Sequence, residues 1–308
     1  MAKTTGRKPG RIAARLVAAA VAVGLVGTGA TAFAADTPKA PSAFALAEAG
    51  KAEAGLTAAQ SGPTGEEAFA PLFGVDRSDR GWMYLPNGKG GLTDRVELGP
   101  MQGLKAGALA DNTADGLPDG MWTWDYKGGL YFGGDNIDDF RVGGGWNIYD
   151  KVLSPGNLGG AQAADLLARD SAGTLWLYLG YGNGKLTSRY KVGGGWGQYT
   201  QIAGNGDLTG DGKADIVARD REGTLWLYKG TGDHKAPFQT RTKVGGGWNT
   251  YNTLVSSGDV DRDGKTDLLG RGNDGSLWLY KGTGNASAPY KQRVKIGNGG
   301  WNTYRILF

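Results

Sequence analysis

The chain has 308 residues, with 34 Lys and Arg against 30 Asp and Glu, which gives a formal net charge of +4. It contains no Cys, which excludes disulfides and thiolate metal sites as supports of the fold. Its 57 Gly, 10 Trp and 13 Tyr suit short aromatic strands joined by tight turns better than helices.

Residues 1–34 have the three parts of a secretory signal peptide. A basic head extends to Arg15, an apolar stretch runs from Leu16 to Val26, and Ala32-Phe33-Ala34 has the small-residue pattern that precedes a cleavage site. We therefore expect a secreted, extracellular protein. The apolar stretch is shorter than the roughly 18 residues that span a bilayer, so membrane insertion is not expected, and an uncleaved signal anchor is the alternative.

The charge of the chain changes once this segment is set aside. It holds five of the 34 Lys and Arg and no Asp or Glu, so the remaining chain has 29 basic and 30 acidic side chains, a net charge of −1. Such a chain has no general attraction for nucleic acid, which we do not expect as a partner. Residues 35–66, rich in Ala, Ser, Thr and Pro, are predicted to be a linker or pro-segment.

From residue 67 onward the sequence repeats with a period near 50 residues. Gly173-Thr-Leu-Trp-Leu-Tyr178 recurs as Gly223–Tyr228 and Gly275–Tyr280. This period is typical of a four-stranded propeller blade. The Leu-Trp-Leu-Tyr segment is apolar on both faces, as expected of a strand covered on both sides by neighbouring blades. The five units are expected at about 67–110, 111–156, 157–206, 207–258 and 259–308.

The last complete unit predicts four strands, at residues 250–256, 267–271, 276–281 and 291–296. The first unit lacks an opening strand, whereas the residues after Trp301 supply a spare one at the C-terminus. We predict that this C-terminal strand completes the N-terminal blade. The result is an all-β, five-bladed β-propeller of four-stranded blades without a free sheet edge.

Three units carry a nine-residue loop between their first and second strands. Asp occupies positions 1, 5 and 9, Asp or Thr position 3, and Gly position 6. Ca²⁺ takes six to eight oxygen ligands, and alternate side chains of a tightly curled loop can converge on one ion. The alternative is a set of Asp-Gly hairpin turns without metal. The expected ligands, with the position-7 carbonyl by analogy with the EF-hand loop, are Asp111, Thr113, Asp115, Leu117, Asp119, Asp207, Thr209, Asp211, Lys213, Asp215, Asp259, Asp261, Asp263, Lys265 and Asp267.

The equivalent loop of the middle unit, residues 157–165, keeps only the two end positions and is not expected to bind metal. Up to three structural Ca²⁺ sites are therefore predicted. Because the loop occurs with and without its full set of acidic residues, we expect the ion to stabilise a hairpin and not to perform chemistry.

The Asp loop followed by Asp-Leu-Leu or Asp-Ile-Val resembles the FG-GAP/VCBS repeat of integrin-type β-propellers, over about residues 111–280. That resemblance implies calcium binding by the loop positions given above. Integrin-type propellers usually have seven blades, for which this chain is too short. The segment Lys295–Trp301, with Tyr304–Phe308 after it, is similar to the closing strand of tachylectin-type lectins. This second resemblance implies five blades and binding of N-acetylated sugars.

A lectin-like module for glycans or cell-wall sugars is the predicted function. Its candidate ligand-binding residues are aromatic side chains that follow Gly runs and are expected in exposed loops, where their rings can stack on sugars. The alternative role of these residues is packing between blades. They are Trp146, Trp196, Trp248, Trp301, Tyr149, Tyr199, Tyr251 and Tyr304.

Two other functions remain open from the sequence. A protein-interaction or adhesion module is the second candidate, with a secreted or cell-surface protein as its partner. A propeller lyase or hydrolase is the third, but no catalytic residue is assigned. His234 is the only His and lies in a polar loop, where we expect it to be solvated. The neighbours Asp138 and Asp139 are expected to point to opposite faces of a strand.

Overall fold

The computed structural model describes residues 71–113, 118–134 and 137–308. The predicted signal peptide and linker lie outside these residues. No helix in the described part of the chain has the length and apolar character needed to cross a bilayer.

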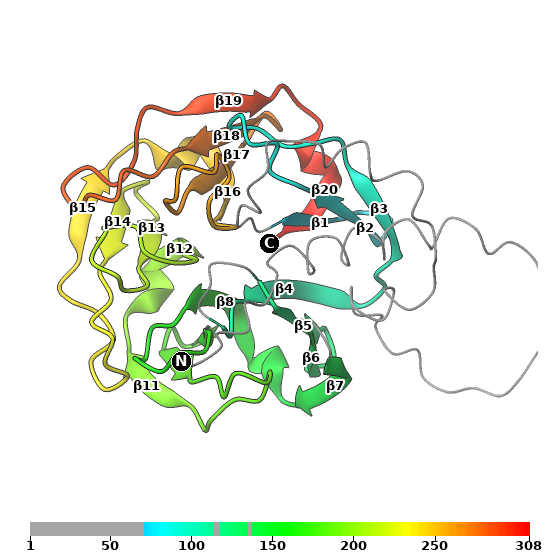
Figure 1. The fold of residues 1–308 in the computed structure, drawn as a ribbon, viewed down its shortest axis with the longest axis vertical. Coiled ribbons are helices and arrows are strands. Elements are labelled where there is room, and N and C mark those ends of the chain that lie inside the picture. The colour runs from blue at the N-terminus through cyan, green and yellow to red at the C-terminus, as the bar shows by residue number, and fades with distance from the viewer. Residues whose placement is uncertain (1–70, 114–117, 135–136) are drawn as a thin grey trace, which may run out of the picture.

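The described strands form five four-stranded antiparallel sheets, which are the blades of a ring (Figure 1). Blade 1 contains β20 (Tyr304–Leu307), β1 (Leu72–Asp76), β2 (Arg80–Tyr84) and β3 (Val96–Pro100). Blade 2 contains β4 (Leu104–Ala110), β5 (Gly120–Asp125), β6 (Leu130–Gly134) and β7 (Ile137–Gly143). Blade 3 contains β8 (Tyr149–Gly156), β9 (Asp165–Asp170), β10 (Leu175–Tyr178) and β11 (Tyr190–Gly193).

Blade 4 contains β12 (Tyr199–Ala203), β13 (Ile216–Asp220), β14 (Leu225–Tyr228) and β15 (Thr242–Gly245). Blade 5 contains β16 (Tyr251–Val255), β17 (Leu268–Gly272), β18 (Leu277–Tyr280) and β19 (Val294–Gly297). The first strand of each blade lies at the centre of the ring, and β11, β15 and β19 lie at its periphery (Figure 1). These sheets confirm the predicted five-bladed propeller.

The Leu-Trp-Leu-Tyr strands pack on both faces, as their sequence predicts. In β10 the buried Leu175 and Leu177 join a cluster with Trp196 and Tyr199 at the boundary with blade 4. The alternating side chains of β10 are half-buried and face the opposite way, toward the cluster shared with blade 2. Each blade is therefore packed between its two neighbours, and three further buried clusters join the remaining blades in the same manner.

Short 3₁₀ helices connect the outer strand of one blade to the inner strand of the next. They are η3 (Trp146–Ile148), η4 (Trp196–Gln198), η5 (Trp248–Thr250) and η6 (Trp301–Thr303). The Gly before each Trp has φ between 81° and 84°, a left-handed conformation that Gly adopts without steric cost. The Gly runs of the sequence thus turn the chain from one blade into the next.

The C-terminal strand closes the ring, as predicted. β20 pairs with β1 in antiparallel register, with Gly74 opposite Leu307. Phe73 and Phe308 exchange two backbone hydrogen bonds of 2.8 and 3.0 Å, and their rings stack at 5.6 Å. Arg271 of blade 5 also donates to the carbonyl oxygens at both ends of the η6 turn. The closing strand is therefore held both by strand pairing and by the hydrogen bonds of the Arg271 guanidinium.

Candidate functional site

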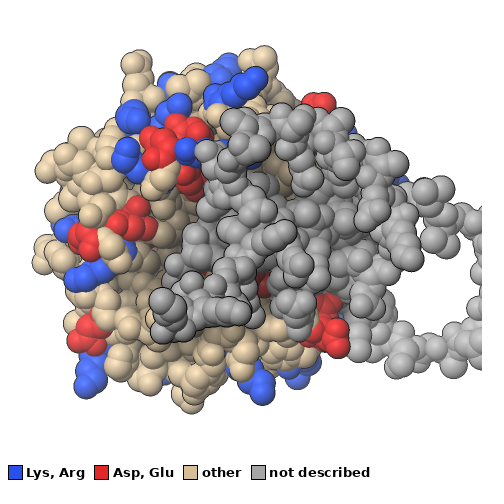
Figure 2. All heavy atoms as spheres, viewed as in Figure 1, with Lys and Arg blue, Asp and Glu red and all other residues tan. Residues whose placement is uncertain are grey.

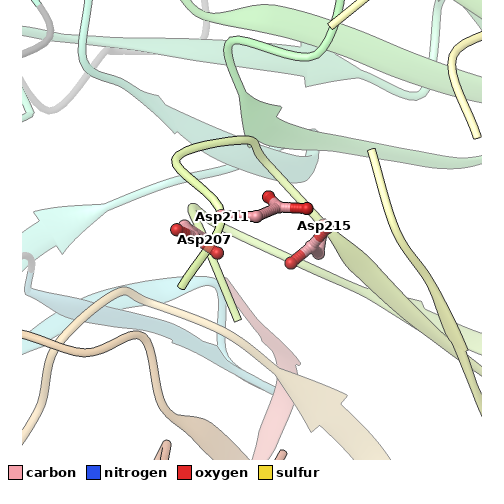
Figure 3. Close-up of side chains that lie close together, drawn as sticks. All are labelled: Asp207, Asp211 and Asp215. Carbon is pink, nitrogen blue, oxygen red and sulfur yellow. The ribbon is translucent and has the colours of Figure 1, made fainter. Parts of the chain in front are cut away.

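The loop between β12 and β13 brings three predicted metal ligands together. Carboxylate oxygens of Asp207, Asp211 and Asp215 all lie within 4.8 Å of one another (Figure 3). Three backbone N–H groups of the loop donate to Asp207, at 2.9, 2.7 and 2.6 Å. The loop therefore curls around its first residue, and the left-handed φ of 78° at Gly212 permits this curl.

Asp215 ties this loop to the outer half of the blade. Its carboxylate is fully buried and accepts hydrogen bonds from the backbone of Leu208 at 3.0 Å and of Gly230, after β14, at 2.8 Å. Burial raises the pKa of Asp215, while the N–H groups of Gly230 and Leu208 work against that rise. A nearby cation would stabilise the charged form of such a carboxylate.

The loop between β16 and β17 forms a second group. Asp259, Asp261 and Asp267 have carboxylate oxygens within 4.8 Å of one another. Burial, together with repulsion from Asp261 and Asp259, raises the pKa of Asp267 to about 7, although the N–H of Gly282 opposes that rise. The side chain of Asp261 is only 6% exposed; one oxygen lies 2.7 Å from Lys281 Nζ, while the other is buried without a hydrogen-bond partner.

The charges of both groups fit a divalent cation. Lys229 Nζ lies 3.1 Å from Asp211, as Lys281 Nζ lies near Asp261, so each group combines three carboxylates with one ammonium. With all three carboxylates ionised, the net charge is −2. An all-oxygen donor set with that charge has the chemistry that Ca²⁺ prefers. Both groups can therefore hold a metal ion.

The structure does not place every predicted ligand in these groups. Asp263 lies outside the second one and faces the ammonium groups of Lys291 at 3.3 Å and Lys265 at 3.7 Å. Blade 4 thus assembles positions 1, 5 and 9 of its loop, and blade 5 assembles positions 1, 3 and 9. The carbonyls of Lys213 and Lys265 as metal ligands stay a prediction.

The loop of blade 2 is described only in part. Asp115 and Leu117 lie outside the described residues. Asp119 accepts hydrogen bonds from the backbone and side-chain amides of Asn112 at 3.0 and 2.8 Å, and burial raises its pKa. The Thr113 hydroxyl lies 3.5 Å from Asp111 Oδ1. The third calcium site stays a prediction.

The loop of blade 3 has the same terminal Asp without the other carboxylates. Asp165 is fully buried and accepts from the backbone of Leu158, Gly159 and Gly180 at 2.9, 2.7 and 3.0 Å. These bonds match those of Asp215 and Asp267. The terminal Asp therefore holds the hairpin in blades with and without an acidic group. On the face seen in Figure 2, acidic side chains form separate small groups with Lys or Arg beside them.

The expectation that the Trp residues after the Gly runs are exposed is wrong. Trp146, Trp196, Trp248 and Trp301 are 6–9% exposed, and Tyr149, Tyr199, Tyr251 and Tyr304 are 2–3% exposed. Each Trp ring packs on a Tyr of the next blade, as Trp196 does on Tyr228 with ring centroids 4.6 Å apart. The left-handed Gly before each Trp directs the indole inward. Burial between blades is favourable because it removes the large apolar surface of the indole from water.

A different set of aromatic residues reaches the surface. In four blades the third strand of the sheet carries a half-buried Trp, within Leu-Trp-Leu-Tyr in blades 3, 4 and 5 and within Gly-Trp-Met-Tyr in blade 1. An Arg guanidinium lies over each of these rings at 4.0–4.3 Å. Sequence reasoning missed these residues. We call them the Trp–Arg sites; their pairs are Trp82 with Arg95, Trp176 with Arg189, Trp226 with Arg241, and Trp278 with Arg293.

The Trp–Arg sites of blades 1, 3 and 4 are held by the same hydrogen bonds. In blade 3, Trp176 Nε1 donates to Asp170 at 2.8 Å, and Arg189 donates to the Tyr149 hydroxyl at 3.0 Å. The Tyr149 hydroxyl in turn lies 2.5 Å from that of Tyr178. The bond from the indole and two backbone N–H groups keep the pKa of Asp170 low. The predicted inner-strand Tyr residues thus contribute only their hydroxyls, which position the Arg.

Blade 5 replaces the Asp partner of the indole by a hydroxyl, since Trp278 Nε1 donates to Ser276 at 2.7 Å. Blade 2 departs further. Tyr131 takes the place of Trp and donates to Asp125 at 3.3 Å, and no Arg covering this ring is found in the described part of the blade. Four of the five blades therefore present a Trp–Arg site.

The residues considered for catalysis do not converge on one place. His234 is half-buried, with its ring packed edge-on against Tyr190 at 4.8 Å, and not fully solvated as expected. Asp138 and Asp139 are both exposed on β7.

Comparison with known proteins agrees with the repeat. A family model described as an FG-GAP-like repeat matches residues 207–270, which confirms that resemblance for blade 4 and the start of blade 5. No curated protein is similar to the chain in sequence.

Among solved structures, human WBSCR16 is similar at 11% identity and a TM-score of 0.35, over 70% of this chain and 61% of that one, less than two thirds of its length. A lectin of Agrocybe aegerita that recognises non-reducing terminal N-acetylglucosamine is 19% identical, with a TM-score of 0.42, over 79% of this chain and 71% of that one. The BP39L lectin of Burkholderia pseudomallei is 15% identical, with a TM-score of 0.44, over 76% and 72%.

Proposed function

We propose that this protein is a secreted glycan-binding module whose ring is stabilised by Ca²⁺ in the loops of blades 4 and 5. The observation that carries the proposal is the recurrence of the Trp–Arg site in four blades. The indoles of these sites also pack against the blade boundaries, but that packing does not require the Arg that lies over each exposed ring face.

The groups at each site suit a sugar. Ligand sites combine apolar or aromatic surface with a few fixed polar groups, and here a half-buried indole, a guanidinium and a Tyr hydroxyl meet on a rigid strand. One such site offers little contact area and a weak affinity. Four equivalent sites on one ring gain avidity for a glycan that repeats or is displayed densely.

Calcium has a structural role in this proposal. Asp207, Asp211 and Asp215 would hold one ion, and Asp259, Asp261 and Asp267 another. Each ion would bind the loop to the buried terminal Asp, which itself bonds to the far end of the third strand. Secretion is supported by the signal-type sequence of residues 1–34.

A glycan array with the full chain, run with calcium and with a chelator, tests the function. We expect binding to immobilised glycans, which weakens when the glycans are displayed sparsely and when chelation destabilises blades 4 and 5. Absence of all glycan binding, with capture of a protein that free sugars do not displace, would replace this proposal by a protein-interaction module.

A further inference from the structure

We propose that the Trp–Arg sites of blades 3, 4 and 5 recognise the acidic groups of an anionic polysaccharide. This inference names the ligand class of the proposed function and rests on it. It starts from the Arg itself, because the guanidinium lies over the indole face that a neutral sugar would otherwise use for stacking. A ligand approaching these sites therefore meets a cation first.

A second cation stands beside the Arg in these three blades. Lys191 is the direct cross-strand partner of Trp176, Lys243 of Trp226, and Lys295 of Trp278. Directly opposed residues project from the same face of a sheet, so each Lys borders its indole. In blade 5 the contact is explicit, with Lys295 Nζ 5.2 Å from the Trp278 ring centroid. All three Lys side chains are exposed at the periphery of the ring.

The nearby acidic residues offset only part of this charge. In blade 3, Arg189 and Lys191 face one carboxylate, that of Asp170, which is occupied by the indole N–H and by two backbone N–H groups. Two cations and one carboxylate give a net charge of +1. Blade 4 repeats this count with Asp220, and blade 5 with Asp274, whose pKa is lowered by Ser276 and also by the charge of Lys295.

Blade 1 shows what the site looks like without the extra charge. There the cross-strand partner of Trp82 is Glu97, which forms a 2.6 Å ion pair with Arg80. With Arg95 and Asp76 included, the charges of this site sum to zero. The chain therefore contains a neutral Trp–Arg site as an internal reference for the three basic ones.

A repeating anionic polymer fits this arrangement best. The chain without residues 1–34 has a net charge of −1, so the attraction is local to the sites and not a property of the whole surface. Guanidinium groups pair with carboxylate and sulfate oxygens in a planar, bidentate manner. Three basic sites on consecutive blades allow one chain of uronate or sulfated sugars to occupy several sites at once, which multiplies weak contacts.

The test uses the full chain in calcium, with binding measured to immobilised polygalacturonate, a sulfated polysaccharide, neutral dextran and double-stranded DNA. Comparing the affinity for polygalacturonate with that for the sulfated polysaccharide shows whether carboxylate or sulfate groups are recognised. We expect binding to at least one acidic polysaccharide, falling steeply with salt, and about tenfold weaker binding in the triple variant Lys191→Gln, Lys243→Gln and Lys295→Gln. These Lys side chains are exposed, so thermal unfolding should stay unchanged.

Blade 1 provides the matched control. Glu97→Lys converts its neutral site into a basic one, and we expect tighter binding to the acidic polysaccharide, whereas Glu97→Gln should have a smaller effect. If only neutral glycans bind, with no change in the triple Lys variant, the acidic specificity is wrong and glycan binding stands. If no glycan binds, both proposals fail. DNA bound as tightly as the polysaccharide would also overturn the assignment, since charge alone would then explain the binding.

Discussion

The loops of blade 3 and blade 5 perform the same structural task with different chemistry. Asp165 and Asp267 are both fully buried and both accept a backbone N–H from the end of the third strand of their blade. Blade 5 adds Asp259 and Asp261 around this carboxylate, and their repulsion contributes to raising the pKa of Asp267 to about 7. The hairpin therefore needs only its terminal Asp. The additional carboxylates are unfavourable alone and become favourable with a cation.

The largest effect is expected from a variant that removes the terminal Asp, which both loops have. Asp165→Ala leaves three buried or half-buried backbone N–H groups without their acceptor, and hydrogen bonds to charged groups contribute about 1.5–3 kcal/mol each. We expect the free energy of unfolding to fall by about 6 kcal/mol, equally with and without calcium. Chemical denaturation checks this, with the exposed Asp138→Ala as the control. A loss below about 1 kcal/mol would mean that the terminal Asp does not hold the hairpin.

The second largest effect is expected from a variant that removes the additional carboxylates, which the blade 3 loop does not have. Calcium at roughly 100 times its Kd should stabilise the wild type by about 2.7 kcal/mol per site. The double variant Asp211→Ala and Asp261→Ala keeps both terminal Asp residues and should lose this gain. Thermal unfolding with calcium and with chelator measures it, and Asn157→Ala in the blade 3 loop is the control. An unchanged calcium response in the double variant would place the ion elsewhere.

The pH dependence of the calcium effect follows from Asp267. Its pKa is raised in the folded state, so the calcium-free protein loses stability from this group as pH rises from about 4, near the ordinary value, to about 7. Calcium binds the deprotonated form and removes the loss. The difference in melting temperature between calcium and chelator should therefore grow from pH 5 to pH 8. A difference that shrinks over this range would contradict the assigned ligand.

The smallest effect concerns the ammonium beside the second group. Lys281→Met removes the cation 2.7 Å from Asp261 and leaves three carboxylates without a counter-charge. Because Lys281 is partly exposed, we expect a loss of about 1 kcal/mol in chelator, together with tighter calcium binding. Lys213→Met, in the blade 4 loop, is the control. Weaker calcium binding in Lys281→Met would show that the Lys supports the metal site and does not compete with the ion.

The sequence predicted the architecture well because the repeat constrains it. The Leu-Trp-Leu-Tyr strands, the closing strand and the strand β17 lie within a residue or two of their expected bounds. The last strand of blade 5, expected from residue 291, begins at Val294, and Arg293 just before it lies over the Trp278 ring.

The candidate sites were harder to predict because they depend on the direction of single side chains. Spacing placed the Asp residues in one loop, but the curl of the backbone decides that Asp261 joins the group and that Asp263 faces Lys291. The Trp–Arg sites were not predicted from the sequence for a related reason. The Arg follows its Trp by 13 residues in blades 1 and 3 and by 15 in blades 4 and 5, so no fixed motif marks the pair.

Calcium titration of the full chain by isothermal calorimetry tests most directly whether the added carboxylates of blades 4 and 5 form ion sites. The wild type is expected to bind at least two ions, and the variant Asp211→Ala with Asp261→Ala two fewer, while Asn157→Ala binds as many as the wild type. Equal numbers of ions in the wild type and the double variant would contradict the account.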